Sequence, residues 1–177
     1  MNEARANRLM EKLWGTGADV VYAILDGARD PELVPTLLSA GLQYKCLFSG
    51  NLSRELARAA PYLVRLNRHG EPTQQLVDRV WGNSAGIFLA SPSPLEDLRR
   101  HFRRFLQVQS PSGGKLFFRY YDPRVLRVYL PTCDEGELGV VFGPVLRFML
   151  EGANPAEMIV FQRVGRSMAK VQIAWEA

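Results

Sequence analysis

The sequence predicts an α/β fold in the broad, mixed α+β sense: a central mixed sheet with flanking helices and a smaller C-terminal lobe. Short apolar segments alternate with segments of helical periodicity along the first hundred residues. A strand, a turn and a helix follow one another near the N-terminus, as in the opening of an α/β unit. The last third holds a helix pair and three apolar segments separated by turn residues, which predicts antiparallel strands there.

The N-terminal part is expected to supply most of the central sheet. After a first helix over Glu3–Trp14, the segment Asp19–Leu25 is β-branched and apolar with little polar alternation, which is typical of a strand covered on both faces. Asp26-Gly27 ends this strand, and Pro31 begins a helix that Gly41 stops. We expect further strands over Tyr44–Phe48, Tyr62–Leu66 and Ile87–Ala90, and further helices over Leu52–Ala59, Thr73–Trp81 and Ser93–Leu106.

In the C-terminal part, the aromatic segment Lys115–Tyr121 predicts a strand whose rings lie in the core. Asp122 is expected to cap a helix with Pro123 at its first position, and Asp134 to cap a second short helix. The closing strands are expected over Val145–Leu150, Met158–Gln162 and Val171–Trp175. We divide the chain into an N-terminal α/β lobe over 1–112 and a C-terminal α+β lobe over 113–177, the alternative being one continuous domain.

Composition excludes several classes of protein. Among the 177 residues, 47% are apolar and 23% charged, which is typical of a globular chain rather than a disordered one. A net charge of +4 is weak for a nucleic-acid-binding protein. No apolar run approaches the ~20 residues of a membrane span, and the N-terminus lacks the apolar core of a signal peptide. We therefore expect a cytoplasmic protein without membrane insertion, in which Cys46 and Cys133 are reduced.

Motifs for catalysis and for cofactors are missing from the sequence. There is no G-x-S-x-G elbow, Walker loop, G-x-G-x-x-G or H-E-x-x-H. Neither His69 nor His101 has a second ligand at metal-binding spacing. We expect no cofactor, no metal and no enzymatic activity. The alternative is a hydrolase-like α/β enzyme that uses Asp26, since such enzymes place carboxylates at strand ends, although Asp-Gly is also an ordinary turn.

The one concentrated charge feature is the helix that contains Arg99 and Arg103. Its apolar stripe consists of leucines and phenylalanines, so the arginines occupy the remaining face, which is most simply a solvated exterior. That basic face is also suited to an acidic patch on a partner protein, and binding of nucleic acid is the weakest of the three interpretations. His101, on the same helix, either faces solvent or packs as a neutral ring.

A series of segments carries a resemblance to a known family. In order along the chain they are YAILDGARDPEL (Tyr22–Leu33), APYLVRL (Ala60–Leu66), Trp81-Gly82, LRRHFRRFLQV (Leu98–Val108), FRYYDPRVLRVYLP (Phe118–Pro131) and VVFGPV (Val140–Val145). This series resembles the type VI secretion system effector adaptor/chaperone family (domain of unknown function 4123). The match runs from about Val20 to Gln162, and the order of the segments makes it more specific than any one of them.

The resemblance implies a binding role. Members of the family bind one toxic effector, often at an N-terminal helical or transmembrane segment, and load it onto the VgrG spike protein. We therefore expect two partners, the cognate type VI effector and VgrG, and a chain that is monomeric when free. The candidate partner-binding residues are the family-motif positions Asp26, Tyr121, Asp122, Arg124 and Phe142, and Arg99 and Arg103 on the basic face. For Arg124, a contact with a partner and an ion pair within the chain are both open.

Overall fold

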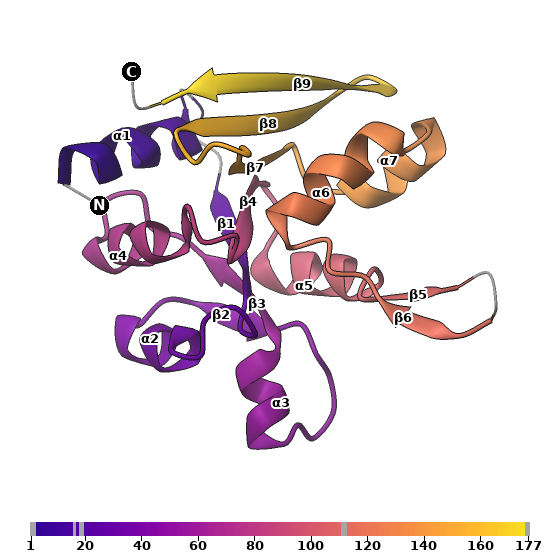
Figure 1. Ribbon diagram of the computed structural model, residues 1–177, viewed down its shortest axis with the longest axis horizontal. Helices are drawn as coiled ribbons and strands as arrows, with labels where there is room; N and C mark the ends of the chain where they lie inside the picture. Colours follow the sequence, from indigo (N-terminus) through magenta and orange to yellow (C-terminus); the bar gives the residue numbers. More distant parts are fainter. Residues whose placement is uncertain (1–2, 16, 18–19, 111–112, 176–177) are drawn as a thin grey trace.

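The computed structural model describes residues 3–15, 17, 20–110 and 113–175. One sheet crosses the molecule (Figure 1). Its strands are β1 (Val21–Asp26), β2 (Tyr44–Cys46), β3 (Pro61–Arg65), β4 (Gly86–Ala90), β7 (Arg147–Glu151), β8 (Glu157–Val164) and β9 (Ser167–Ala174). Their spatial order is β2-β3-β1-β4-β7-β8-β9, so the sheet joins strands from both ends of the chain.

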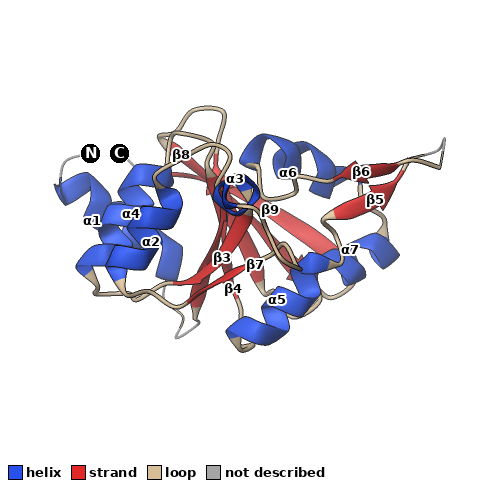
Figure 2. Ribbon diagram, turned by 90° about the horizontal axis from the view of Figure 1, so that it is seen from below, coloured by secondary structure: helices blue, strands red, loops and turns tan. Residues whose placement is uncertain are grey.

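Helices cover both faces of the sheet (Figure 2). One layer holds α1 (Glu3–Trp14), α2 (Leu33–Ala40) and α4 (Glu71–Val80), and the other holds α5 (Leu95–Arg103), α6 (Pro123–Tyr129) and α7 (Glu135–Phe142). A short helix, α3 (Arg54–Ala59), connects β2 to β3 and projects from the body of the molecule (Figure 1). A hairpin of β5 (Gln107–Gln109) and β6 (Lys115–Phe117) extends from the layer of α5 to α7.

The central strand β1 is buried on both faces, as the sequence predicted. Val21, Ala23 and Leu25 pack in the core beneath α1, α2 and α4, whereas Tyr22 and Ile24 pack in the core beneath α5, α6 and α7. Successive side chains of a strand point to opposite faces, so a strand between two helical layers has no polar side. Each buried Val, Leu or Ile side chain contributes about 1.5–3 kcal/mol of apolar burial. Asp19, the expected start of this strand, lies outside the described residues.

The predicted α/β, mixed α+β class is confirmed. The sheet, however, was expected to contain both parallel and antiparallel pairs of strands. Every ladder in the described part of the sheet is antiparallel. The β1–α2–β2 unit does return β2 in the direction of β1, but β3 is inserted between the two strands. In the same way β1 lies between β3 and β4, which α4 connects. The α/β units expected from the sequence are thus present, each split by an antiparallel strand.

Most predicted elements agree with the structure to within two or three residues at each end. The helix expected from Pro31 begins instead at Leu33, and Gly41 ends it in a left-handed conformation (φ 64°), as expected. The helix expected to reach Leu106 ends at Arg103, because the chain then turns into β5, which the sequence did not predict. Both predicted N-caps are confirmed: Asp122 accepts a hydrogen bond from the backbone of α6, and Asp134 forms a capping box with Glu137.

The strand expected over Lys115–Tyr121 was the main error. β6 ends at Phe117, and it pairs only with β5, in a hairpin separate from the central sheet. The Phe117 side chain is therefore 64% exposed rather than part of the core, whereas Tyr120 and Tyr121 are buried in the segment that follows the strand. An aromatic run favours extended structure, but it does not say whether that strand joins the main sheet.

The C-terminal strands form the predicted antiparallel set, and β7 pairs with β4. The division into two lobes stays a prediction, and residues 111–112, at its boundary, lie outside the described residues.

At the end of α7, Gly143 has φ 46°, and a Cβ atom there would lie 2.4 Å from Cε1 of His101. Only glycine fits this turn without strain. Among the described helices, none is long and apolar enough to cross a membrane.

Candidate partner-binding site

Four of the family-motif residues lie close together where β1 ends: Asp26, Tyr121, Asp122 and Arg124. Asp26 is fully buried, and its carboxylate forms an ion pair with Arg119, in the segment between β6 and α6. The other carboxylate oxygen of Asp26 accepts a hydrogen bond from the backbone N–H of Ala28 at 3.0 Å. The ion pair raises the pKa of Arg119 above its ordinary value, since the charged guanidinium is the form that hydrogen-bonds Asp26.

Asp122 and Arg124 form a second ion pair beside the first. Asp122 is buried and accepts from the Arg124 backbone N–H at 2.9 Å and from Nη2 of Arg124 at 2.6 Å. Burial acts to raise the pKa of Asp122, but the hydrogen bonds and charge of Arg124 outweigh it and the net pKa is lowered. Of the two alternatives left open for Arg124, the structure contains the ion pair within the chain, with about half of the side chain still exposed.

The two aromatic candidates lie in the core. Burial, and next the charge of Asp26, raise the pKa of Tyr121 to about 12, so its hydroxyl stays protonated at neutral pH. Phe142 is fully buried and packs edge-on against Phe148, with ring centroids 5.1 Å apart. Neither residue presents a ring to solvent in this structure.

The two arginine candidates on α5 differ in their surroundings. Arg99 donates to the backbone oxygen of Cys46 at 2.9 Å and to Oε1 of Glu96 at 3.1 Å. Arg103 makes no side-chain hydrogen bond or ion pair with any residue that the structure describes, and it lines a pocket. Arg103 is therefore the candidate whose charge is left for a partner.

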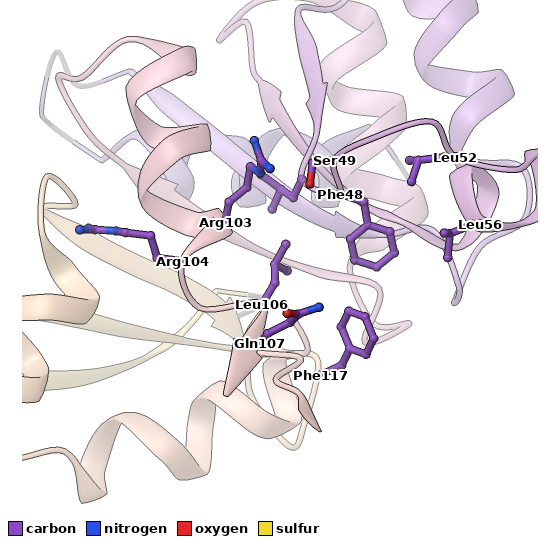
Figure 3. Close-up of a pocket in the computed structure, with 10 residues that line it drawn as sticks. Phe48, Ser49, Leu52, Leu56, Arg103, Arg104, Leu106, Gln107 and Phe117 are labelled. Carbon is purple, nitrogen blue, oxygen red and sulfur yellow. The ribbon is translucent and has the colours of Figure 1, made fainter. Parts of the chain in front are cut away.

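This pocket has a volume of about 500 Å³ and is open to solvent (Figure 3). It lies between the β2–α3 segment, the C-terminal end of α5 and the β5–β6 hairpin. Six of the side chains that line it are apolar: Leu47, Phe48, Leu52, Leu56, Leu106 and Phe117. The rings of Phe48 and Phe117 are 5.7 Å apart, so the β5–β6 hairpin contacts the segment between β2 and α3. Ser49, Gln107, Arg103 and Arg104 complete the lining.

The lining is suited to binding rather than to proton transfer. Its ten residues include no aspartate, glutamate, histidine or cysteine, and therefore no ordinary general base that could activate the hydroxyl of Ser49. Arg104 is hydrogen-bonded to His101, whose Nδ1 lies 2.9 Å from Nη2 of Arg104. No cluster of three or more metal-ligating side chains occurs in the part of the chain that the structure describes.

Sequence reasoning named only Arg103 among the residues of this pocket. Leu52 and Leu56 were assigned to one predicted helix and Phe117 to a predicted core strand, without the exposed face of either element being recognised. Leu56 is the one apolar residue larger than alanine in the helix RELARA, which is too few to bury a helix face. That imbalance was the available signal for a surface leucine.

Comparison with known proteins defines the class. The chain matches the family model described as Domain of unknown function (DUF4123) over residues 21–139, and it belongs to this family, as the sequence resemblance predicted. Among curated proteins it is similar to Accessory protein VasW of Vibrio cholerae serotype O1 (strain ATCC 39315 / El Tor Inaba N16961). The two are 31% identical over 114 residues, which is 63% of this chain and only 38% of the length of VasW. No solved structure matches the chain.

Proposed function

We propose that this protein has a role in type VI secretion as an adaptor: it binds an effector, shields an apolar segment of it, and delivers it to the VgrG spike. Membership of the family and similarity to an accessory protein support a secretion-related role. In this proposal the protein is a cytoplasmic, non-enzymatic chaperone that is monomeric until it meets its cargo. Asp26, Asp122, Tyr121 and Phe142 act mainly by holding the fold.

The observation that carries the proposal is the apolar pocket. Leu56, on α3, is 46% exposed and Phe117, on the β5–β6 hairpin, is 64% exposed, and both line the pocket. Large apolar side chains gathered at one exposed place commonly mark a surface that another protein covers. A specific complex of standard size would bury ~1,200–2,000 Å² in total, so the pocket would form the centre of a larger contact.

The alternative, an enzyme that uses Asp26, is less well supported. Both carboxylate oxygens of Asp26 already have partners, in Arg119 and Ala28. The ring nitrogens of His101 are engaged by Arg104 and by the backbone oxygen of Val141. A catalytic acid or base needs a free position toward substrate, and neither group has one in this arrangement.

Binding of nucleic acid by α5 is also less well supported. Arg99 pairs with Glu96, and Arg100 pairs with Asp97, on the same helix. Acids of the same helix therefore pair with two of the three arginines of α5, whereas phosphate binding needs several uncompensated cations.

Co-expression with the products of the neighbouring genes tests the proposal. A stable complex should co-elute in size-exclusion chromatography, and Phe117→Ser should abolish it. Val128→Ser is the matched control, because Val128 is 69% exposed on α6 and does not line the pocket. If no neighbouring gene product co-elutes, or if both variants retain the complex equally, the proposal in this form is wrong.

A further inference from the structure

The two sides of the apolar pocket differ in chemistry. In Figure 3, Phe48, Leu52, Leu56 and Phe117 lie on one side of the opening, and Arg103 and Arg104 lie on the other. The apolar side belongs to the β2–α3 segment and the hairpin, whereas the arginines follow each other at the end of α5. A segment that fills the pocket therefore contacts apolar side chains on one side and positively charged arginines on the other.

Arg103 is the cation that an occupant would meet. It is half-buried, and within the described residues no carboxylate pairs with it. The arginines before it on α5 differ, since Arg99 and Arg100 each have an acidic partner three residues earlier. Arg104 points away from the apolar wall in Figure 3 and is bonded to His101.

The surroundings of the pocket do not neutralise this charge. The ten lining residues contain two arginines and no acid. On α3, exposed Arg54 and Arg58 outnumber Glu55. Both acids of α5 already have partners, since Glu96 is bound by Lys45 at 3.3 Å and by Arg99, and Asp97 is bound by Arg100. A half-buried guanidinium without a partner favours an occupant that supplies a carboxylate, because charge-assisted hydrogen bonds are the strong ones.

We propose that the pocket selects an amphipathic segment of its protein partner, with apolar side chains on one face and an aspartate or glutamate at the border of that face, placed against Arg103. This inference rests on the proposed adaptor function and adds the chemistry of the recognised segment. The apolar wall supplies affinity, and Arg103 supplies the orientation and rejects segments with a lysine or arginine at the border.

Synthetic peptides test the inference without knowledge of the natural cargo. Three fluorescently labelled 16-residue helical peptides would share leucines at positions i, i+3, i+4 and i+7 and differ in one border residue, which is glutamate, glutamine or lysine. Binding would be followed by fluorescence anisotropy. The wild-type protein should bind the glutamate peptide about tenfold more tightly than the lysine peptide, with the glutamine peptide between them.

Variants of Arg103 separate the contribution of its charge from that of the apolar side chains. Arg103→Glu should reverse the preference for the glutamate peptide, and Arg103→Gln should remove it without reversal. Arg100→Glu is the matched control on the same helix, since Arg100 is exposed and lies outside the pocket lining, and it should leave the preference unchanged. Circular dichroism of each variant would verify folding before binding is compared.

The outcomes distinguish the inference from the proposed function. If the wild type binds all three peptides equally and Leu56→Asp abolishes that binding, the pocket is an apolar site and the charge requirement is wrong. If Arg100→Glu and Arg103→Glu have the same effect, the selection comes from the overall charge of α5 and the role of Arg103 is wrong. If no peptide binds the wild type, the pocket is not a site for such segments, whatever co-expression with the effector gives.

Discussion

Asp26 at the end of β1 and Arg119 before α6 form an ion pair across 93 positions of sequence, with the carboxylate fully buried and the guanidinium partly exposed. The ion pair holds the segment between the β5–β6 hairpin and α6 against the end of the central strand β1. It also brings the motif Asp26-Gly27 next to the motif that contains Asp122 and Arg124. These family motifs thus have a structural explanation that requires neither catalysis nor contact with a partner.

Replacement of Asp26 by alanine should therefore lower stability. Arg119 would lose its buried acceptor, but it is 42% exposed and can be hydrated, so we expect a loss of about 1–3 kcal/mol in the free energy of unfolding. Urea denaturation measures this. Glu135→Ala, which removes an exposed ion pair with Arg166, is the control and should cost under about 0.5 kcal/mol. Equal losses in the two variants would contradict the structural role of Asp26.

Local sequence signals predicted the elements that depend on neighbouring residues. The unbroken apolar run of β1 indicated burial on both faces, and Asp122 and Asp134 indicated helix starts through their capping side chains. The insertion of β3 between β1 and β2 was not predictable in the same way, because strand order depends on contacts between segments distant in sequence. For the same reason the pairing of β6 with β5 alone was missed.

Two phenylalanines test the distinction between core and pocket. Phe142 is fully buried, so Phe142→Ala should lower the free energy of unfolding by about 3–5 kcal/mol. Phe117 is 64% exposed, so Phe117→Ala should change it by under about 0.5 kcal/mol. Urea denaturation of both variants checks the expectation. A large loss in Phe117→Ala would mean that the hairpin is part of the cooperative fold rather than a surface kept for a partner.

The candidate site was predictable only in part. Arg103 was identified because a cluster of arginines is visible in sequence, but its lack of an acidic partner was not, since Arg99 and Arg100 show the same residue type. Phe142 and Tyr121 were chosen from the family motif and lie in the core. A motif records which residues recur together, and it does not separate those that fill the interior from those that face a partner.

Glu151 is a further buried carboxylate whose removal should lower the free energy of unfolding. It accepts hydrogen bonds from the backbone N–H groups of Gly82 and Ser84 and from the Ser84 hydroxyl, and so holds the turn after Trp81. Glu151→Ala would leave these groups without their acceptor, at a cost of about 1–3 kcal/mol. Thermal unfolding measures it, with exposed Glu32→Ala as the control. A variant as stable as the control would contradict this role.

His101 adds a pH dependence to the fold. Burial lowers its pKa, and the charge of Arg104 acts in the same direction, although the hydrogen bond to Val141 partly opposes both. The Nδ1 atom accepts from Arg104 while Nε2 lies 2.9 Å from the oxygen of Val141, an arrangement that needs the neutral ring with its proton on Nε2. Protonation would direct a second N–H toward the guanidinium of Arg104.

The folded protein thus holds His101 neutral at a pH where the unfolded chain already binds a proton. Its contribution to stability is complete above the ordinary pKa of 6.5 and is lost as pH falls from there through the lowered pKa of the folded state. Urea denaturation at pH 7.5 and 5.5 should show a decrease in the free energy of unfolding that His101→Gln reduces. His69→Gln, at an exposed position, should leave the decrease unchanged. If His101→Gln keeps the full wild-type decrease, the dependence arises from other groups and the neutral-ring arrangement at Arg104 is wrong.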